Sequence, residues 1–215
     1  MDNSILAIYK TLLAHHGDLK WWPAKTPYEV IVGAVLTQNT AWGNVEKAIA
    51  NFANLSPNFV LEASNEELEI IIRPAGFFKQ KALYLKAVTT WYARYNFDVQ
   101  TVQEKPLDKI RRELLAVKGV GKETADSILL YAFGFATFVV DAYTMRLCTR
   151  FPIDIEMKYD KVKAYFENNL ERDAEIFNHY HALIVINGKE YCRKTKPLCG
   201  KCSLREVCAM GVSLK

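Results

Sequence analysis

The chain has 215 residues, of which 50% are hydrophobic, so it is long and apolar enough to fold as one large or two small domains, and disorder is excluded except at the ends. Its 28 basic and 24 acidic residues leave a net charge of only +4, which alone does not identify a nucleic-acid-binding protein. Because no signal sequence and no apolar run of about twenty residues is present, we expect a cytoplasmic protein with no membrane partner.

The first clear helix signal lies near residue 26. Thr26 supplies an N-cap, Pro27 occupies the first helical position, and Glu29 completes a capping pattern that starts a helix through Val35. These residues predict a helix whose apolar side chains belong to the core.

Helical periodicity continues through most of the remaining chain. Ser64 and Glu67 form a second capping box. Val139 and Val140 are the only short pair that favours β structure, so we predict an all-α protein with short connections. Apolar residues three and four positions apart predict further helices over 78–95, 106–117, 123–133, 142–151, 160–170 and 176–187.

Two glycines separate the helices predicted over 106–117 and 123–133. Gly119 and Gly121 permit a turn with positive dihedral angles, and Val120 between them can fill the space between the helices. Such a hairpin exposes backbone N–H groups, which suit a DNA phosphate or a cation that bridges to one. Lys118 and Lys122 flank the turn. A plain corner between two helices is the alternative.

Asp141 directly precedes the predicted helix 142–151. An aspartate at this position caps a helix, and its carboxylate can also serve chemistry in a cleft. Cys148, within the same apolar pattern, is predicted to be a buried small residue.

Four cysteines near the C-terminus form a compact metal-binding pattern, C-x6-C-x2-C-x5-C, which we call the cysteine cassette: Cys192, Cys199, Cys202 and Cys208. Only the middle pair has the short spacing of a zinc knuckle, so the uneven steps favour a [4Fe-4S] cluster over structural zinc. A disulfide is least favoured, because the expected compartment is reducing. Basic residues crowd around the cassette: Lys189, Arg193, Lys194, Lys196, Lys201 and Arg205.

The combined motifs resemble the endonuclease III superfamily of helix-hairpin-helix DNA glycosylases over nearly the full length. The resemblance rests on Leu36–Thr40, Gly76–Ala82, the glycine hairpin, Val139–Asp141, Asn187–Lys189 and the cysteine cassette. It implies a six-helix domain over 24–134 that contains the hairpin, and a second helical domain from 1–23 and 135–215 that carries a [4Fe-4S] cluster. Double-stranded DNA with damaged bases would bind in the cleft between them. We expect a monomeric, nucleoid-associated enzyme.

One position departs from the bifunctional members of that superfamily. They carry a lysine where this chain has Glu123, and a carboxylate cannot form the Schiff base that strand cutting requires. Asp141 keeps its place and can stabilise a cationic sugar while orienting or deprotonating a water. The resemblance therefore implies monofunctional hydrolysis. Glu123 either adds negative potential, holds the water, or has a structural role.

A second resemblance concerns the target base. Trp21, Trp22, Pro23 and Trp42 are similar to residues of endonuclease III-like 3-methyladenine DNA glycosylases, in which aromatic residues matching Trp21 and Trp42 sandwich the extruded base. Indole faces attract N-alkylated purines, which carry positive charge and have weakened glycosidic bonds. Core packing is the alternative for the tryptophans. Some members of that subgroup lack the cysteine cassette, which this chain has.

The resemblance also assigns roles in opening the duplex. Gln38 would fill the gap opposite the flipped nucleotide, Phe77 would insert between neighbouring bases, and either could instead be buried. Lys189 matches a basic position near the pocket and would contact a phosphate or the base. The competing functions are a glycosylase/lyase for oxidised pyrimidines, a mismatch glycosylase, and a damage-binding protein without catalysis.

Overall fold

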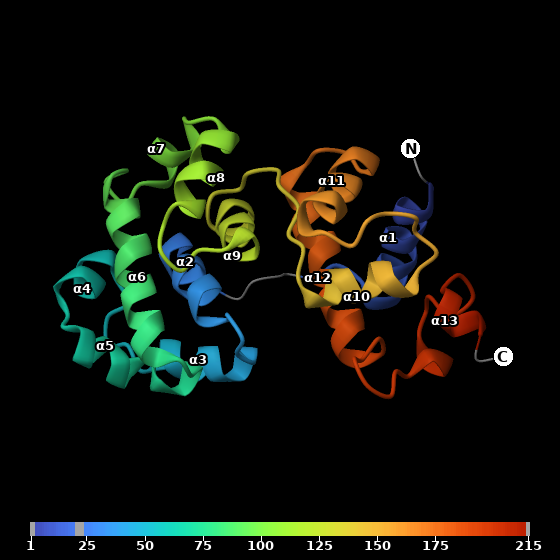
Figure 1. The fold of residues 1–215 in the computed structure, drawn as a ribbon, viewed down its shortest axis with the longest axis horizontal. Helices are drawn as coiled ribbons and strands as arrows, with labels where there is room; N and C mark the ends of the chain where they lie inside the picture. Colours follow the sequence, from blue (N-terminus) through green and yellow to red (C-terminus); the bar gives the residue numbers. More distant parts are fainter. Residues whose placement is uncertain (1–2, 20–23, 214–215) are drawn as a thin grey trace. The chain divides into compact units, whose positions relative to one another are not determined.

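The computed structural model describes residues 3–19 and 24–213, and it divides the chain into two compact units (Figure 1). One unit combines Met1–Trp21 with Ala136–Lys215, and the other is Trp22–Phe135. Every regular element in the described residues is helical, which confirms the predicted all-α fold. Within those same residues, no helix is long and apolar enough to cross a membrane.

The unit of residues 22–135 is built around one buried helix, α2. Its elements are α2 (Pro27–Leu36), α3 (Trp42–Ala50), α4 (Pro57–Glu62), α5 (Asn65–Ile71), η1 (Arg73–Ala75), α6 (Phe78–Ala93), α7 (Val99–Gln103), α8 (Leu107–Leu115), α9 (Lys122–Ser127) and η2 (Ile128–Ala132). Every residue from Val30 to Leu36 is buried, and α3, α6, α9 and η2 pack against α2. A helix that is apolar on all sides belongs in the middle of a core, and this sequence places α2 there.

The N-caps of the two predicted capping patterns in this unit are confirmed. Thr26 Oγ1 accepts a hydrogen bond from the backbone N–H of Glu29 at 3.1 Å. Ser64 Oγ accepts one from the backbone N–H of Glu67 at 3.0 Å. Each oxygen satisfies an N–H group that the first turn of a helix leaves without a partner.

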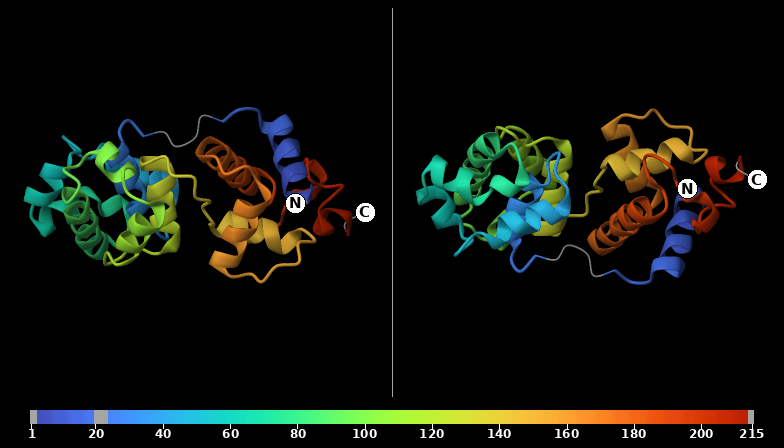
Figure 2. Two further views of the ribbon diagram at one scale, coloured as in Figure 1. Left: turned by 90° about the horizontal axis from the view of Figure 1, so that it is seen from above. Right: turned by 90° about the horizontal axis from the view of Figure 1, so that it is seen from below.

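The other unit brings the two ends of the chain together. Its elements are α1 (Asn3–His16), α10 (Ala142–Arg150), α11 (Tyr159–Asn169), α12 (Ala174–Glu190), η3 (Cys199–Lys201) and α13 (Ala209–Val212). α1 packs against α11 and α12 (Figure 2), and the hydroxyl of Tyr180 donates to the carbonyl oxygen of Ile5 at 2.9 Å. The rings of Phe138 and Phe166 stack with centroids 4.2 Å apart. Cys148 is buried as predicted, and burial raises the pKa of its thiol to about 12.

Local details differ from the predicted elements where regular periodicity fails. The helix predicted over 123–133 is α9 followed by the π-helical turn η2, whose wider spacing a 3.6-residue pattern does not reveal. Val139 and Val140 are buried but form no strand within the described residues. Short helices such as α4 and α7 contain too few turns for their apolar spacing to indicate a helix.

Candidate active site and DNA-binding elements

Asp141 caps the N-terminus of α10 and carries a largely buried carboxylate. Its Oδ1 accepts hydrogen bonds from the backbone N–H of Thr144 at 2.7 Å and from the Thr144 hydroxyl at 3.1 Å. Its Oδ2 lies 3.6 Å from Nε2 of His181 on α12. Burial acts to raise the pKa of Asp141, but the neighbouring imidazole and the hydrogen bonds outweigh burial and hold the pKa below its ordinary value. The carboxylate is therefore ionised at neutral pH and held in one orientation.

The glycine hairpin joins α8 to α9, and only one of its glycines has a positive dihedral angle. Gly119 has a φ of +85°, whereas Gly121 is extended, with a φ of −88°, and caps α9. A Cβ atom on Gly119 would lie 2.2 Å from the ring of Tyr84, so the ring packs directly on the turn. Val120 is buried, as predicted. Glycine is required at position 119 for both conformation and packing.

An ion pair fastens the two helices of the hairpin. Arg111 of α8 donates two hydrogen bonds to the carboxylate of Asp126 of α9, at 2.8 and 3.0 Å. The side chain of Asp126 is 0% exposed and that of Arg111 is 20% exposed. A two-point guanidinium–carboxylate contact fixes distance and angle together, so it sets how the helices meet. On the surface of the hairpin, three predicted site residues are exposed: Lys118, Lys122 and Glu123.

The segment 37–40, which follows α2, contacts this hairpin through Gln38. The Nε2 atom of Gln38 donates to the carbonyl oxygen of Gly119 and to Thr124 Oγ1, both at 2.9 Å. The next residue, Asn39, is exposed and has a left-handed φ of 52°. The side chain predicted to fill a gap in DNA thus has its amide engaged within the protein, while its neighbour reaches solvent.

Phe77 is an exposed aromatic residue at the N-terminus of α6. Its exposed fraction is 65%, so the alternative that it belongs to the core is wrong. It follows Gly76 and has a left-handed φ of 47°. This backbone conformation is unfavourable for a bulky residue and persists only where the surrounding structure imposes it. The fold therefore holds Phe77 in solvent at a conformational cost.

Of the tryptophans predicted to hold the base, the structure describes Trp42. Trp42 begins α3, is half-buried, and packs against the core of residues 22–135. Trp21, Trp22 and Pro23 lie outside the described residues, so the predicted aromatic pair stays a prediction. Lys189 is exposed in the last turn of α12.

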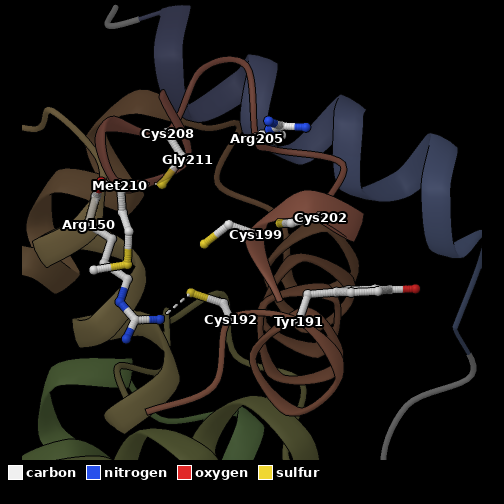
Figure 3. A pocket seen from close by; sticks show the side chains of 9 residues that line it. All are labelled: Arg150, Tyr191, Cys192, Cys199, Cys202, Arg205, Cys208, Met210 and Gly211. Carbon is white, nitrogen blue, oxygen red and sulfur yellow. Dashed lines mark hydrogen bonds between the residues drawn. The ribbon is translucent and has the colours of Figure 1, made fainter. Parts of the chain in front are cut away.

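The four cysteines of the cassette line a common hollow (Figure 3). Its remaining lining residues are Arg150, Tyr191, Arg205, Met210 and Gly211. In Figure 3 the sulfur atoms of Cys192, Cys199 and Cys208 point into the shared space. Arg150 contributes twice: its Nη1 donates to Cys192 Sγ at 3.1 Å, and its carbonyl oxygen lies 3.4 Å from Cys208 Sγ. The cassette is therefore one site.

The residues of this hollow are of the type that holds a [4Fe-4S] cluster or a zinc ion. Among the described residues, no three ligand-type side chains converge on a point that could hold a single metal ion. Structural zinc draws four sulfurs to about 2.3 Å from one centre, whereas a cluster takes its thiolates at separate irons around a larger body.

Three residues beside these sites were not singled out from the sequence. His181 could have been noticed as a polar residue within the apolar run of α12. Asn39 adjoins the residue to which the gap-filling role was given. Lys81 is 2% exposed. Its spacing of four and seven residues from the buried Leu85 and Val88 places it on the core face of α6, a signal that could have set it apart from the exposed Lys79.

Known proteins show the same fold and related sequences. The profile of the family described as HhH-GPD superfamily base excision DNA repair protein matches residues 32–172. A Methanocaldococcus jannaschii protein whose name proposes a DNA repair glycosylase is 48% identical over 210 residues, covering 95% of each chain.

Two solved structures extend this comparison. The 3-methyladenine DNA glycosylase of H. pylori, solved with 1,N6-ethenoadenine, is 27% identical with a TM-score of 0.76, covering 86% of this chain and 97% of that one. A trapped endonuclease III–DNA covalent intermediate has a TM-score of 0.83, covering 100% of this chain and 98% of that one; at 23% identity it shows the fold alone.

Proposed function

The chain belongs to the HhH-GPD superfamily of base-excision DNA repair proteins and is a DNA glycosylase, and from this premise we propose that it hydrolyses the N-glycosidic bond of alkylated purines, such as 3-methyladenine, without cutting the strand. Its partner is DNA. We expect no strand cutting because of Glu123. This residue lies in the first turn of α9, where bifunctional relatives have the attacking lysine. Lys122 precedes it, but a step of one residue turns a helical side chain by about 100°.

Asp141 is the proposed catalytic carboxylate. When the bond between C1′ and the base breaks, the base leaves with the bonding electrons and the sugar becomes cationic. An ionised carboxylate stabilises this charge, and it can take a proton from the water that adds to C1′. The two Thr144 hydrogen bonds engage Oδ1, which fixes the carboxylate before the substrate arrives.

A relative of known name and the placement of Trp42 support the proposed substrate class. The H. pylori relative acts on 3-methyladenine and was solved with an adenine derivative. Trp42 is half-buried rather than enclosed in the core, and an indole face attracts the positive charge of an N-alkylated purine. Because the glycosidic bond of such a base is already weakened, one carboxylate suffices without a strong general acid.

An endonuclease III-type glycosylase/lyase is the second candidate, and the observation that favours it is the sequence similarity to the endonuclease III of Sulfolobus acidocaldarius, 27% identical over 186 residues. The two functions differ in their products. We expect the protein to release 3-methyladenine from methylated DNA, to leave the strand intact, and to resist borohydride trapping on DNA. Duplexes containing thymine glycol, uracil or mismatched thymine, assayed in parallel, report the alternatives. Trapping of the protein on any of these substrates would overturn the monofunctional assignment.

A [4Fe-4S] cluster is the proposed occupant of the cysteine hollow. Cys192, Cys199, Cys202 and Cys208 would hold it, and Arg150 would donate a hydrogen bond to one thiolate. Bound there, the cluster crosslinks the irregular segment between α12 and α13 and so contributes to folding. Iron and sulfide analysis of the purified protein tests this assignment; stoichiometric zinc without iron contradicts it.

We assign the gap-filling role to Asn39 rather than Gln38. Moving the Gln38 side chain into DNA would break its two hydrogen bonds to the hairpin, whereas the Asn39 side chain is already exposed. Asn39→Ala should slow base release from duplex DNA and leave the melting temperature nearly unchanged. Gln38→Ala should instead lower the free energy of unfolding by about 1 to 3 kcal/mol, because Gly119 and Thr124 lose a partner. The reverse pattern, measured by single-turnover kinetics and thermal unfolding, returns the role to Gln38.

A further inference from the structure

Lys81 is a buried lysine near the start of α6, and its side chain joins three separate pieces of backbone. Its Nζ atom donates hydrogen bonds to the carbonyl oxygen of Leu36 at 2.8 Å, to Thr40 Oγ1 at 2.8 Å and to the carbonyl oxygen of Ala75 at 2.9 Å. These three acceptors use all three donors of an ammonium group. They come from the end of α2, from the segment that follows it, and from the end of η1.

The position suits a positive charge for a specific reason. Leu36 is the last residue of α2 and Ala75 is the last residue of η1, and carbonyl groups at helix C-termini carry partial negative charge and lack helical partners. Even so, burial lowers the pKa of Lys81 to about 8, so placing the ammonium here opposes its preference for water. An apolar residue of similar length would avoid that desolvation but would leave three acceptors without this donor.

The same contacts couple the two segments proposed to enter DNA. Thr40, one residue after Asn39, also donates from its hydroxyl to the carbonyl oxygen of Ala75. The backbone N–H of Lys81 donates to the carbonyl oxygen of Phe77 at 3.0 Å. Asn39 and Phe77 both have left-handed backbones, which need support from their surroundings. The Lys81 side chain thus ties Thr40, next to Asn39, to Ala75, two residues before Phe77.

We propose that Lys81 is a positioning residue that locks the 37–40 segment and Phe77 into a single rigid element for opening the duplex. This proposal rests on the proposed function, because it requires both segments to enter DNA. Extruding a base from a duplex requires filling its place and unstacking its neighbours together, whereas a base in single-stranded DNA requires neither. The effect of Lys81 should therefore be confined to duplex substrates.

The test compares duplex and single-stranded oligonucleotides that carry the same alkylated base. Lys81→Met should lower the single-turnover rate of base release on the duplex by about tenfold, comparable to the loss of a few hydrogen bonds, and leave the single-strand rate unchanged. Thr40→Val removes one link while Lys81 keeps both carbonyl partners, so it should show a smaller loss with the same selectivity. Adding Phe77→Ala to Lys81→Met should cost little more, because residues that act as one unit are not additive.

Lys86 provides a matched control in the same helix. Its ammonium donates to the carbonyl oxygens of Leu61, at 3.3 Å, and of Ala63 at the end of α4, a segment with no proposed DNA contact. Lys86→Met should lower the melting temperature without changing the ratio of duplex to single-strand rates. If Lys81→Met slows both substrates equally, or if Lys86→Met shifts the ratio as much, Lys81 is merely structural.

A second readout separates failure of this proposal from failure of the proposed function. If the unaltered protein releases no alkylated base from either substrate, the proposed function fails. Fluorescence of 2-aminopurine placed beside an abasic site then reports unstacking directly. The unaltered protein should increase this fluorescence, and Lys81→Met should not, at protein concentrations where both variants are fully bound. Equal fluorescence from both proteins would overturn the positioning role.

Discussion

Asp141→Asn is expected to lower the rate of base release by about 10²- to 10⁴-fold while binding to damaged duplex DNA is retained. Asparagine can still accept the backbone N–H of Thr144, because it is as good an N-cap as aspartate. The fold of α10 should therefore survive, and the loss should come from the missing charge. Single-turnover base release and a DNA-binding titration measure the two effects separately.

The pH dependence of this carboxylate has a definite sign. Because the pKa of Asp141 in the folded protein lies below its ordinary value of 3.8, its ionisation adds stability that is present above pH 3.8 and is lost as the pH falls through the folded pKa. The variant lacks that contribution at neutral pH. In the unaltered protein, protonation of Asp141 should not limit base release until the pH is below 3.8.

Asp173 offers a control with the same capping role and no proposed chemistry. It caps α12, in the same unit, and accepts the backbone N–H of Ile176 at 2.9 Å. Asp173→Asn should therefore keep nearly full base release. Full activity in Asp141→Asn, or an equal loss in Asp173→Asn, would rule out Asp141 as the catalytic carboxylate.

The features predicted well from the sequence depend on neighbours in the chain. Caps such as Thr26 and Ser64 act on backbone groups three residues away, so their spacing alone indicates the helix start. The same holds for Asp141 as a cap. Burial of Cys148 followed from its place in an apolar periodic pattern.

Contacts between residues distant in the chain could not be predicted this way. No pattern in the sequence indicates that the Lys81 ammonium hydrogen-bonds to carbonyl groups of two other helices, or that His181 lies beside Asp141. Gln38 illustrates the limit most directly, because its motif suggested contact with DNA while its amide hydrogen-bonds to a hairpin about eighty residues later. A side-chain role that depends on tertiary packing can be recognised only in the folded structure.

Asp126→Ala is expected to lower the free energy of unfolding by about 3 kcal/mol, a large share of the 5 to 15 kcal/mol typical of a folded domain. The substitution leaves the largely buried guanidinium of Arg111 without the carboxylate that accepts two of its hydrogen bonds. The exposed pair of Glu104 and Lys105, 3.7 Å apart, is the control, and Glu104→Ala should cost less than about 1 kcal/mol because solvent screens that pair. Urea denaturation measures both.

The same ion pair links stability to DNA binding, because it sets how α8 and α9 meet at the glycine hairpin. Replacing both partners with apolar residues, as in Arg111→Met with Asp126→Leu, removes the buried charges and should recover most of the unfolding free energy. DNA affinity should recover less, since an apolar contact does not reproduce the two-point geometry that orients the hairpin. If the double variant regains stability and affinity together, the ion pair contributes only to folding. An Asp126→Ala protein as stable as the unaltered chain would refute the structural role itself.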